Sequence, residues 1–349
     1  FGSQERQRAR APARQSIVGA GLVPARKKGA VLIIALWILS MLVLLAISIG
    51  RRTSIELRLL KYHLSRSQAF HLARAAIERI YAEKNTDNNN SDSLNESWSN
   101  KKADEEPLFK DFSLGNGTFT LKYNQADRDY YGMQDESSKL NINKILDNDS
   151  QPIDNRKKEF INLIKKALPE KDTQAQEIAE RFIDWIDNAN NQAETFSNGE
   201  IHAKNAPLDR LEELAMIEDF SIEDVNKLSG YITIYGDGSI NINTAPQEVL
   251  SSLCCDKDGN PLGDEAAEEI ITYRSGENGE IKPIENIDTL LSGIISAEEK
   301  KILESRSVVQ SSFYKANSQA EVNGVKKEIS AAINFNQDKA PKYLYWYED

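Results

Sequence analysis

The 349-residue sequence has little of several residue types on which common active sites and small disulfide-rich folds depend. It holds two cysteines, Cys254 and Cys255, which excludes a framework of several disulfides and a multi-cysteine zinc site. It holds three histidines, and neither a His-rich metal site nor a Ser-His-Asp arrangement is visible, so we do not expect an enzyme. Basic residues are outnumbered by acidic ones, 43 to 54, which disfavours binding to nucleic acid through phosphate contacts.

Charge is absent from residues 30–50, and basic residues flank this run at Lys28 and Arg51. The 21 residues would span about 31 Å as a helix, close to the ~30 Å hydrocarbon core of a bilayer. The alternatives are a buried core helix and a cleaved secretory signal, and the latter needs a small-x-small cleavage site that the run lacks. We predict a transmembrane helix over residues 30–50.

The segment before this run is basic, because residues 1–29 carry seven Arg or Lys residues and one Glu. Positively charged flanks stay on the cytoplasmic side of a membrane, so the acidic remainder of the chain should cross it. Arg51, Arg52, Arg58 and Lys61 follow the run and weaken this preference. We expect a single-pass protein whose C-terminal part is exported.

Glycine and proline are both absent from residues 51–106, so nothing stops the helix at the end of the apolar run. Apolar residues continue at three-to-four spacing, at Leu60, Leu64, Phe70, Ala73, Ile77 and Ile80. We predict one helix over residues 30–84, whose second half is amphipathic and packs on a globular domain. The Asn- and Ser-rich residues 85–100 should follow it as a loop.

Strand-forming segments lie on both sides of a helical stretch. Residues 109–114 and 118–123 flank a Gly-Asn-Gly turn and predict a hairpin, and the remaining strands are expected at residues 139–143, 308–314, 331–335 and 344–347. Helices are expected at residues 160–168, 173–186, 208–217 and 221–228, with Ser221 as the cap of the last. This order predicts an α+β fold with an antiparallel sheet and an inserted helical domain.

A four-residue string occurs twice, as Leu140-Asn141-Ile142-Asn143 and as Ile240-Asn241-Ile242-Asn243. Chance can produce such a match, but each copy precedes a mostly helical stretch. Asparagine side chains can close the turn into that stretch. We predict two related helical modules, residues 144–230 and 240–305, within an inserted domain over residues 144–305.

The second module has the order of helix-hairpin-helix domains, which bind the DNA backbone. However, the connection between its helices is Gly259-Asn260-Pro261-Leu262-Gly263 and not an apolar glycine hairpin. Residues 241–305 also carry 14 acidic and 5 basic residues, and such a surface repels phosphate. A SAM-like or hairpin-type helical fold used for protein contacts fits better. A membrane-anchored DNA-binding protein of the competence type is therefore kept as the alternative to a protein that makes protein contacts.

Several short segments resemble known export proteins. Lys28-Gly29-Ala30 before an apolar span resembles a type IV prepilin signal. The order of Asp135-Glu136, the first Asn repeat, Phe182-Ile183-Asp184-Trp185-Ile186-Asp187 and Asn205-Ala206-Pro207-Leu208 resembles the protein K family of type II secretion systems. Ile34 stands where most pilins carry Glu at the fifth mature position, and this absence is typical of that family.

The resemblance implies a pilin-like αβ domain, residues 85–143 and 306–349, that carries the inserted helical domain. It implies that a prepilin peptidase removes a leader, residues 1–29, between Gly29 and Ala30, and that the new N-terminus is methylated. It implies a minor pseudopilin, anchored in the inner membrane with a periplasmic domain, at the tip of the pseudopilus that assists export of folded proteins. The implied partners are minor pseudopilins I and J and not nucleic acid. The expected contact positions are Leu60, Leu64, Phe70, Ala73, Ile77 and Ile80.

Acidic and amide side chains cluster at the end of the second helix, at Asp184, Asp187, Asn190, Glu194 and Glu200. Hard oxygen ligands at close spacing suit calcium, which takes about six to eight of them. The spacing is not that of an EF-hand loop, and a helix end that continues into a solvated loop is the alternative. From sequence alone the solvated loop is favoured. Relatives in the family can hold calcium in the helical domain, and the resemblance makes a calcium site as good an interpretation as the loop, with Asp187 and Glu200 as its first ligands.

Two further features have ordinary interpretations. Cys254 and Cys255 could form a strained vicinal disulfide in an oxidising compartment, but two thiols, at least one of them buried, agree better with disulfide geometry. Asp135 and Glu136 are expected to be turn residues or charges at the edge of a sheet.

Overall fold

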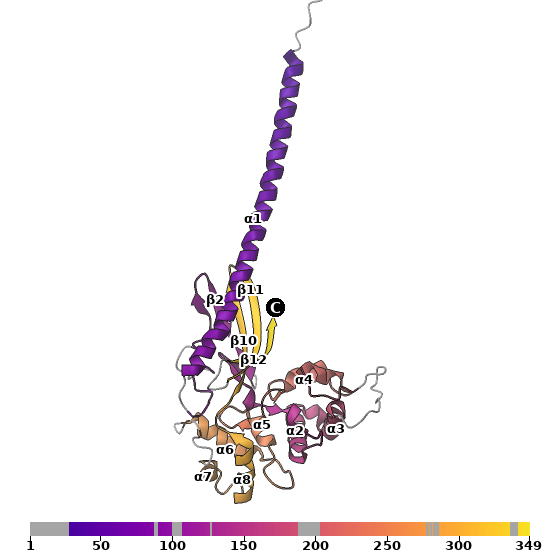
Figure 1. Ribbon diagram of the computed structural model, residues 1–349, viewed down its shortest axis with the longest axis vertical. Helices are drawn as coiled ribbons and strands as arrows, with labels where there is room; N and C mark the ends of the chain where they lie inside the picture. The colour runs from indigo at the N-terminus through magenta and orange to yellow at the C-terminus, as the bar shows by residue number, and fades with distance from the viewer. Residues whose placement is uncertain are drawn as a thin grey trace, which may run out of the picture. The chain divides into compact units, whose positions relative to one another are not determined.

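The computed structural model describes residues 28–86, 90–99, 107–125, 128–187, 203–276, 279, 281, 286–335 and 341–349. The chain divides into two compact units, Phe1–Lys61 and Tyr62–Asp349. Helix α1, Lys28–Thr86, occupies the end of the first unit and the beginning of the second (Figure 1). The single helix predicted for residues 30–84 is confirmed.

The first part of α1 is long enough and apolar enough to cross a membrane. From Val31 to Ile49 the large apolar side chains are each 47 to 74% exposed. Nothing in the described chain covers these side chains. Such an apolar surface is favourable in contact with lipid and unfavourable in contact with water.

The second unit contains an antiparallel sheet in the order β1-β2-β10-β11-β12, with β5 also paired to β10. Its strands are Phe112–Leu114 (β1), Gly117–Leu121 (β2), Gln134–Asp135 (β5), Phe313–Val322 (β10), Val325–Asn334 (β11) and Lys342–Glu348 (β12). A separate pair joins β3, Tyr123–Gln125, to β4, Arg128–Tyr130. The hairpin predicted around Gly115 is confirmed, with Leu114 opposite Gly117.

The C-terminal strands differ from the prediction, because residues 315–322 belong to β10 and residues 325–330 to β11. Asn323 and Gly324 join these strands with φ of 51° and 80°. Positive φ at both turn residues is typical of the two-residue type I′ hairpin, and Asn-Gly is its favoured sequence. The continuous strand predicted over residues 308–314 is wrong. The two-residue strand Ser307–Val308 (β9) ends at Val308, and residues 309–312 separate it from β10.

The second part of α1 packs on this sheet, as its amphipathic pattern predicts (Figure 1). Ala69, Ala73 and Ala76 are fully buried, and their small side chains let the helix approach the strands closely. Strand β2 also lies close to its neighbours. A Cβ atom at Gly117 would lie 2.6 Å from the Glu321 carbonyl oxygen, so a larger residue would push β2 away from β10.

The helical region has its own apolar core and ten described helices of the α and 3-10 types between β6 and β9. The α-helices are Asp154–Ala167 (α2), Ala175–Ile186 (α3), Ile222–Leu228 (α4), Gln247–Ser252 (α5), Asp264–Ser275 (α6), Asn286–Leu290 (α7) and Ala297–Arg306 (α8). The 3-10 helices include Pro169–Gln174 (η3) and Leu211–Met216 (η4). The α-helix predicted over residues 208–217 is therefore wrong, because only a short 3-10 helix forms there. The Ser221 cap is confirmed, since its side chain accepts from the Asp224 amide.

In each helical module, a two-residue strand at the beginning pairs in parallel with a two-residue strand at the end. Leu140–Asn141 (β6) pairs with Ile232–Thr233 (β7), and Ile240–Asn241 (β8) pairs with β9. The strand predicted over residues 139–143 is shorter than expected, because the 3-10 helix Ile142–Lys144 (η2) follows β6 directly. The Asn141 side chain accepts a hydrogen bond from the Asn143 amide and so starts this turn.

Candidate functional site

The two Asn repeats have the same local structure. Asn141 and Asn241 each accept a hydrogen bond, 3.0 Å long, from the amide two residues later. Asn143 bonds to the carbonyl and the amide of Leu208. Asn243 bonds in the same two ways to Ile281. The prediction that these side chains close the turn into each module is confirmed.

Asn241 also joins the second module to the sheet region. Its amide group donates to the Asp92 carbonyl oxygen (3.1 Å), to Asp135 Oδ2 (3.0 Å) and to Ser311 Oγ (2.9 Å). Thr244 donates to the same Asp135 oxygen at 2.6 Å. The loop after α1, strand β5, the start of the second module and the segment before β10 therefore meet in one buried network.

Asp135 and Glu136 lie at a turn, as expected, since the Asp135 side chain accepts a hydrogen bond from the Ser137 amide at the start of the 3-10 helix Glu136–Ser138. They are not surface charges, because they are only 2% and 3% exposed. Burial raises the pKa of Asp135 to about 6, with a smaller contribution from the Asp92 carboxylate, although hydrogen bonds from Thr244 and Ser311 oppose the shift. Burial also acts to raise the pKa of Glu136, but the ammonium groups of Lys139 and Lys315 outweigh it and hold that pKa below its usual value.

A buried ion pair joins the two modules. Glu159 of α2 is fully buried, and its Oε2 lies 2.7 Å from Nη2 of Arg306, the last residue of α8. The Cys254 amide donates to the other carboxylate oxygen at 3.3 Å. No local sequence pattern indicates this pair, since the two residues are 147 positions apart.

The predicted metal ligands fall only partly on described residues. Asn190, Glu194 and Glu200 lie outside them. Asp187 follows the last residue of α3, and its Oδ1 is buried without a hydrogen-bond partner among the described residues. The described residues contain no group of three potential metal ligands from His, Cys, Asp and Glu. An unpartnered buried oxygen fits a cation ligand, and the calcium site stays a prediction.

The two cysteines are free thiols, and both are buried, so the interpretation as two thiols is confirmed. Burial raises the pKa of Cys254 to about 12 and that of Cys255 to about 11. Neither thiol therefore ionises near neutral pH, and neither suits a nucleophilic role.

The six expected contact positions on α1 separate into two groups. Ala73, Ile77 and Ile80 are fully buried in the sheet core, so the expectation that these three contact a partner is corrected. Their apolar spacing reflects packing inside this chain. Phe70 packs against the same core but is partly exposed, and its partner contact stays a prediction. Leu60 and Leu64 are 65% and 58% exposed and remain available to a partner. Gly29 and Ala30 lie in the first turn of α1, and cleavage between them stays a prediction.

Comparison with known proteins agrees with this architecture. The family model "Type II secretion system (T2SS), protein K", first domain, matches residues 138–237. A chain of the crystal structure of the GspK-GspI-GspJ complex from enterotoxigenic Escherichia coli superposes with a TM-score of 0.59 at 18% identity, over 85% of this chain and 99% of that chain. No curated protein matches the sequence. Residues 138–237 therefore match the first domain of type II secretion system protein K, and the chain has the pilin-like fold with an inserted helical domain that its sequence resemblance implies.

Proposed function

We propose that this chain is a minor pseudopilin of a type II secretion system, anchored in the inner membrane, with its sheet and helical region in the periplasm. The observation that carries the proposal is the protein K match at residues 138–237, within a fold shared over 85% of the chain with a GspK-GspI-GspJ structure. By analogy with that complex, its partners are minor pseudopilins I and J, and its role is in export of folded proteins.

The exposed apolar side chains of α1 beyond the predicted membrane span support an assembly role. Ile55, Leu57, Leu59 and Leu60 follow the charged pair Arg51 and Arg52 and are 53 to 65% exposed. At about 100° per residue, Ile55 and Leu59 lie on one side of the helix, and Leu57 and Leu60 lie on roughly the opposite side. A helix with apolar side chains on two opposite sides suits contact with two neighbouring helices.

A position at the tip of the pseudopilus agrees with two features of the chain. The helical region, from β6 to β9, is a large addition to a pilin-like sheet, and a filament end accommodates such bulk without a subunit stacked beyond it. Ile34 also replaces the acidic residue that, in pilins, pairs with the N-terminal amine of a neighbour. A subunit that starts the filament has no earlier neighbour to pair with.

The assembly test is co-purification of the full chain with its cognate I and J subunits in detergent. A Leu60→Asp, Leu64→Asp variant should lose at least tenfold in yield of the three-protein complex. Ile222→Asp is the matched control, because Ile222 is 53% exposed in the helical region and should not affect assembly. Absence of a complex, together with binding to duplex DNA that falls steeply with salt, would support the competence-type alternative instead.

Processing gives a second, independent test of the pilin-type anchor. N-terminal sequencing of the membrane-bound protein should begin at Ala30, and Gly29→Leu should retain the leader. A soluble mature form with its N-terminus near Gly50 would contradict the proposal.

A further inference from the structure

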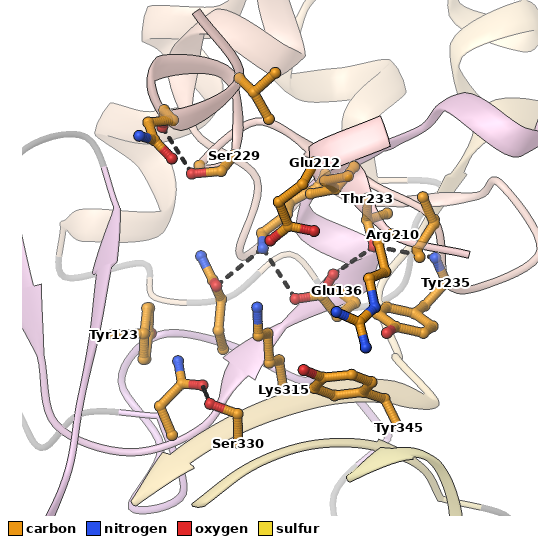
Figure 2. A pocket seen from close by; sticks show the side chains of 18 of the residues that line it. Tyr123, Glu136, Arg210, Glu212, Ser229, Thr233, Tyr235, Lys315, Ser330 and Tyr345 are labelled. Atoms are coloured by element: carbon orange, nitrogen blue, oxygen red, sulfur yellow. Dashed lines mark hydrogen bonds and ion pairs between the residues drawn. The ribbon is translucent and has the colours of Figure 1, made fainter. Parts of the chain in front are cut away.

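A cavity of about 450 Å³ lies between the sheet and the first helical module (Figure 2). Gln134, Glu136, Lys139 and Lys315 line it from strands and turns of the sheet region, while Arg210 of the helical region and Tyr345 of β12 also line it. Cavities of this size accommodate small ligands or one or two residues of a peptide. Neither the family match nor the sequence analysis assigns a role to this cavity.

One hydrogen-bond donor in the wall of the cavity has no partner. Gln134 is 5% exposed, and its Oε1 accepts from Lys139 Nζ at 2.9 Å. Its Nε2 is buried and makes no hydrogen bond with any described residue. A buried donor without a partner destabilises the folded protein, so a ligand acceptor that pairs with it would offset this cost.

Of the charged groups in the cavity wall, the Glu136 carboxylate has partners on both oxygens, whereas the Lys315 ammonium group has none among the described residues. Glu136 accepts from Lys139 at 2.9 Å through one oxygen and from Thr233 through the other, so its carboxylate is satisfied. Lys315 makes no ion pair or hydrogen bond with the described residues. Its positive charge repels that of Lys139. The pKa of Lys139 lies below its usual value, first because of burial, although Glu136 opposes this, and then because of Lys315. A bound anion would relieve the repulsion between the two ammonium groups.

Other acidic groups near the cavity limit how much negative charge it accepts. Asp209 is already paired with Lys204 at 2.7 Å, and Asp135 is held by Asn241, Thr244 and Ser311. Glu212 lies at the rim and is exposed, near the likewise exposed Arg210 (Figure 2). With Glu136 also present, the site suits a single negative charge better than a dianion such as sulfate.

Part of the neutral wall is aromatic and apolar. Tyr235 and Tyr345 line it together with Leu211, Val225 and Ile234. Burial raises the pKa of Tyr235 to about 12, so its hydroxyl stays protonated and can donate a hydrogen bond. The wall therefore suits a ligand that carries an apolar group next to its anionic end.

We propose that this cavity binds a carboxylate, with Lys315 as the charged donor and Gln134 Nε2 as the neutral donor, and with the aromatic wall holding the apolar group beside it. The carboxylate can come from a free small acid or from the C-terminus of a polypeptide. Both sources present the same carboxylate group, and the binding measurements below distinguish them.

The test is isothermal titration calorimetry on the full chain in detergent. The probes are acetyl-Ala-Phe with a free C-terminal carboxylate, the same dipeptide as its C-terminal amide, propionate, and inorganic sulfate. The free-acid dipeptide should bind at least tenfold more tightly than its amide and than sulfate. Propionate that binds as tightly as the dipeptide would identify a free small acid as the source, and weaker binding would identify a chain end.

The variants compare Lys315 of β10 with Lys122, which lies between β2 and β3. Lys315→Met should weaken binding of the free-acid dipeptide at least tenfold, whereas Lys122→Met, which lines a neighbouring cavity, should leave it unchanged. Equal binding of acid and amide by the unsubstituted protein, or no saturable binding of either, would overturn the proposal without reliance on any variant. Equal loss in the Lys122→Met and Lys315→Met proteins would show non-specific charge attraction and would also overturn it.

Discussion

In the first helical module the Asn141 amide group donates to the carbonyl oxygens of Tyr235 and Gly236, both at the end of that module. In the second module the corresponding Asn241 donates to Asp92, Asp135 and Ser311, all outside the module. Both residues start the same local turn. One motif therefore closes the first module on itself and fastens the second module to the sheet region.

The difference follows from what surrounds each copy. Backbone carbonyls at the end of the first module satisfy Asn141 within that module. The second copy lies where three segments from the sheet region converge, and one of them carries the buried Asp135 carboxylate. Hydrogen bonds to charged groups are stronger than those between neutral groups, so the second module should be held more firmly at this point.

The largest expected effect concerns the contact between the two modules. Arg306→Met should lower the free energy of unfolding by about 3–5 kcal/mol, because it leaves the buried Glu159 carboxylate without its cation. Thermal unfolding of the purified chain, followed by circular dichroism, measures this. Glu159→Leu combined with Arg306→Met should recover most of the loss, since no charge then remains buried.

Lys166→Met is the matched control for that prediction. Lys166 and Asp264 also join the two modules, at 2.5 Å, but the Asp264 side chain is 68% exposed. Exposed pairs contribute about 0–1 kcal/mol. An equal loss in the Lys166→Met and Arg306→Met proteins would contradict the assignment of the Glu159–Arg306 pair as the main polar contact.

The second prediction concerns pH and the network around Asp135. The folded-state pKa, about 6, lies above the ordinary value of 3.8, so the folded protein binds more protons than the unfolded one between these pH values. The stability contributed by this proton is fully present below about pH 4 and is lost as the pH rises through about 6. It amounts to roughly 3 kcal/mol.

The Asp135→Asn protein isolates this group. Its amide cannot titrate, so the unsubstituted protein should gain stability relative to the variant as the pH falls from 7 to 4. Thermal midpoints of both proteins across this range measure the difference. Parallel pH profiles would show that Asp135 does not titrate in this window.

The third prediction concerns calcium and distinguishes the modules, because the predicted ligands all lie in the first one. A cation that binds only the folded protein at 100 times its dissociation constant stabilises it by about 2.7 kcal/mol. Calcium should raise the melting temperature after chelator treatment, and magnesium should substitute poorly because it prefers a tight octahedron. Asp187→Ala should reduce the shift, and Asp258→Ala, in the second module, should not. A midpoint that does not respond to calcium would identify the cluster as a solvated loop.

The smallest expected effect is the direct comparison of the two asparagines. Asn241→Ala should cost about 1 kcal/mol more in unfolding free energy than Asn141→Ala, because it removes a donor from a buried carboxylate and not only from neutral carbonyls. Thermal unfolding of both variants under one condition checks this. Equal losses would mean that the link to the sheet region adds no stability.

Local sequence patterns predicted the elements whose formation depends on neighbours in the chain. The absence of Gly and Pro after residue 50 predicted one uninterrupted helix, and Ser221 marked a helix start through its own capping bond. The Asn323-Gly324 turn carried an equally local signal, which the sequence analysis did not use. The 3-10 helix at residues 211–216 was not predictable in the same way, because apolar spacing alone does not distinguish it from an α-helix.

Contacts between distant residues were not predictable from such patterns. The apolar period on α1 was apparent, but whether Ile77 and Ile80 face a partner or the chain's own sheet depends on β2 and on β10 and β11, which begin more than 200 residues after them. Likewise, the turn at Asp135 was predictable, but its burial was not, because it depends on contacts with Asn241, Thr244 and Ser311, far along the chain.

The sequence by itself determined the uncharged helix, the amphipathic segment after it, the two Asn-started modules and the resemblance to protein K. These depend on hydrophobic period, turn chemistry and order along the chain, which neighbouring residues establish. Only the tertiary structure decided that Glu159 pairs with Arg306, that Asp135 is buried beside Asp92, and that Lys315 and Gln134 line one cavity. Such arrangements arise from the closure of long loops, where the free energy of burial, and not local preference, selects which side chains meet.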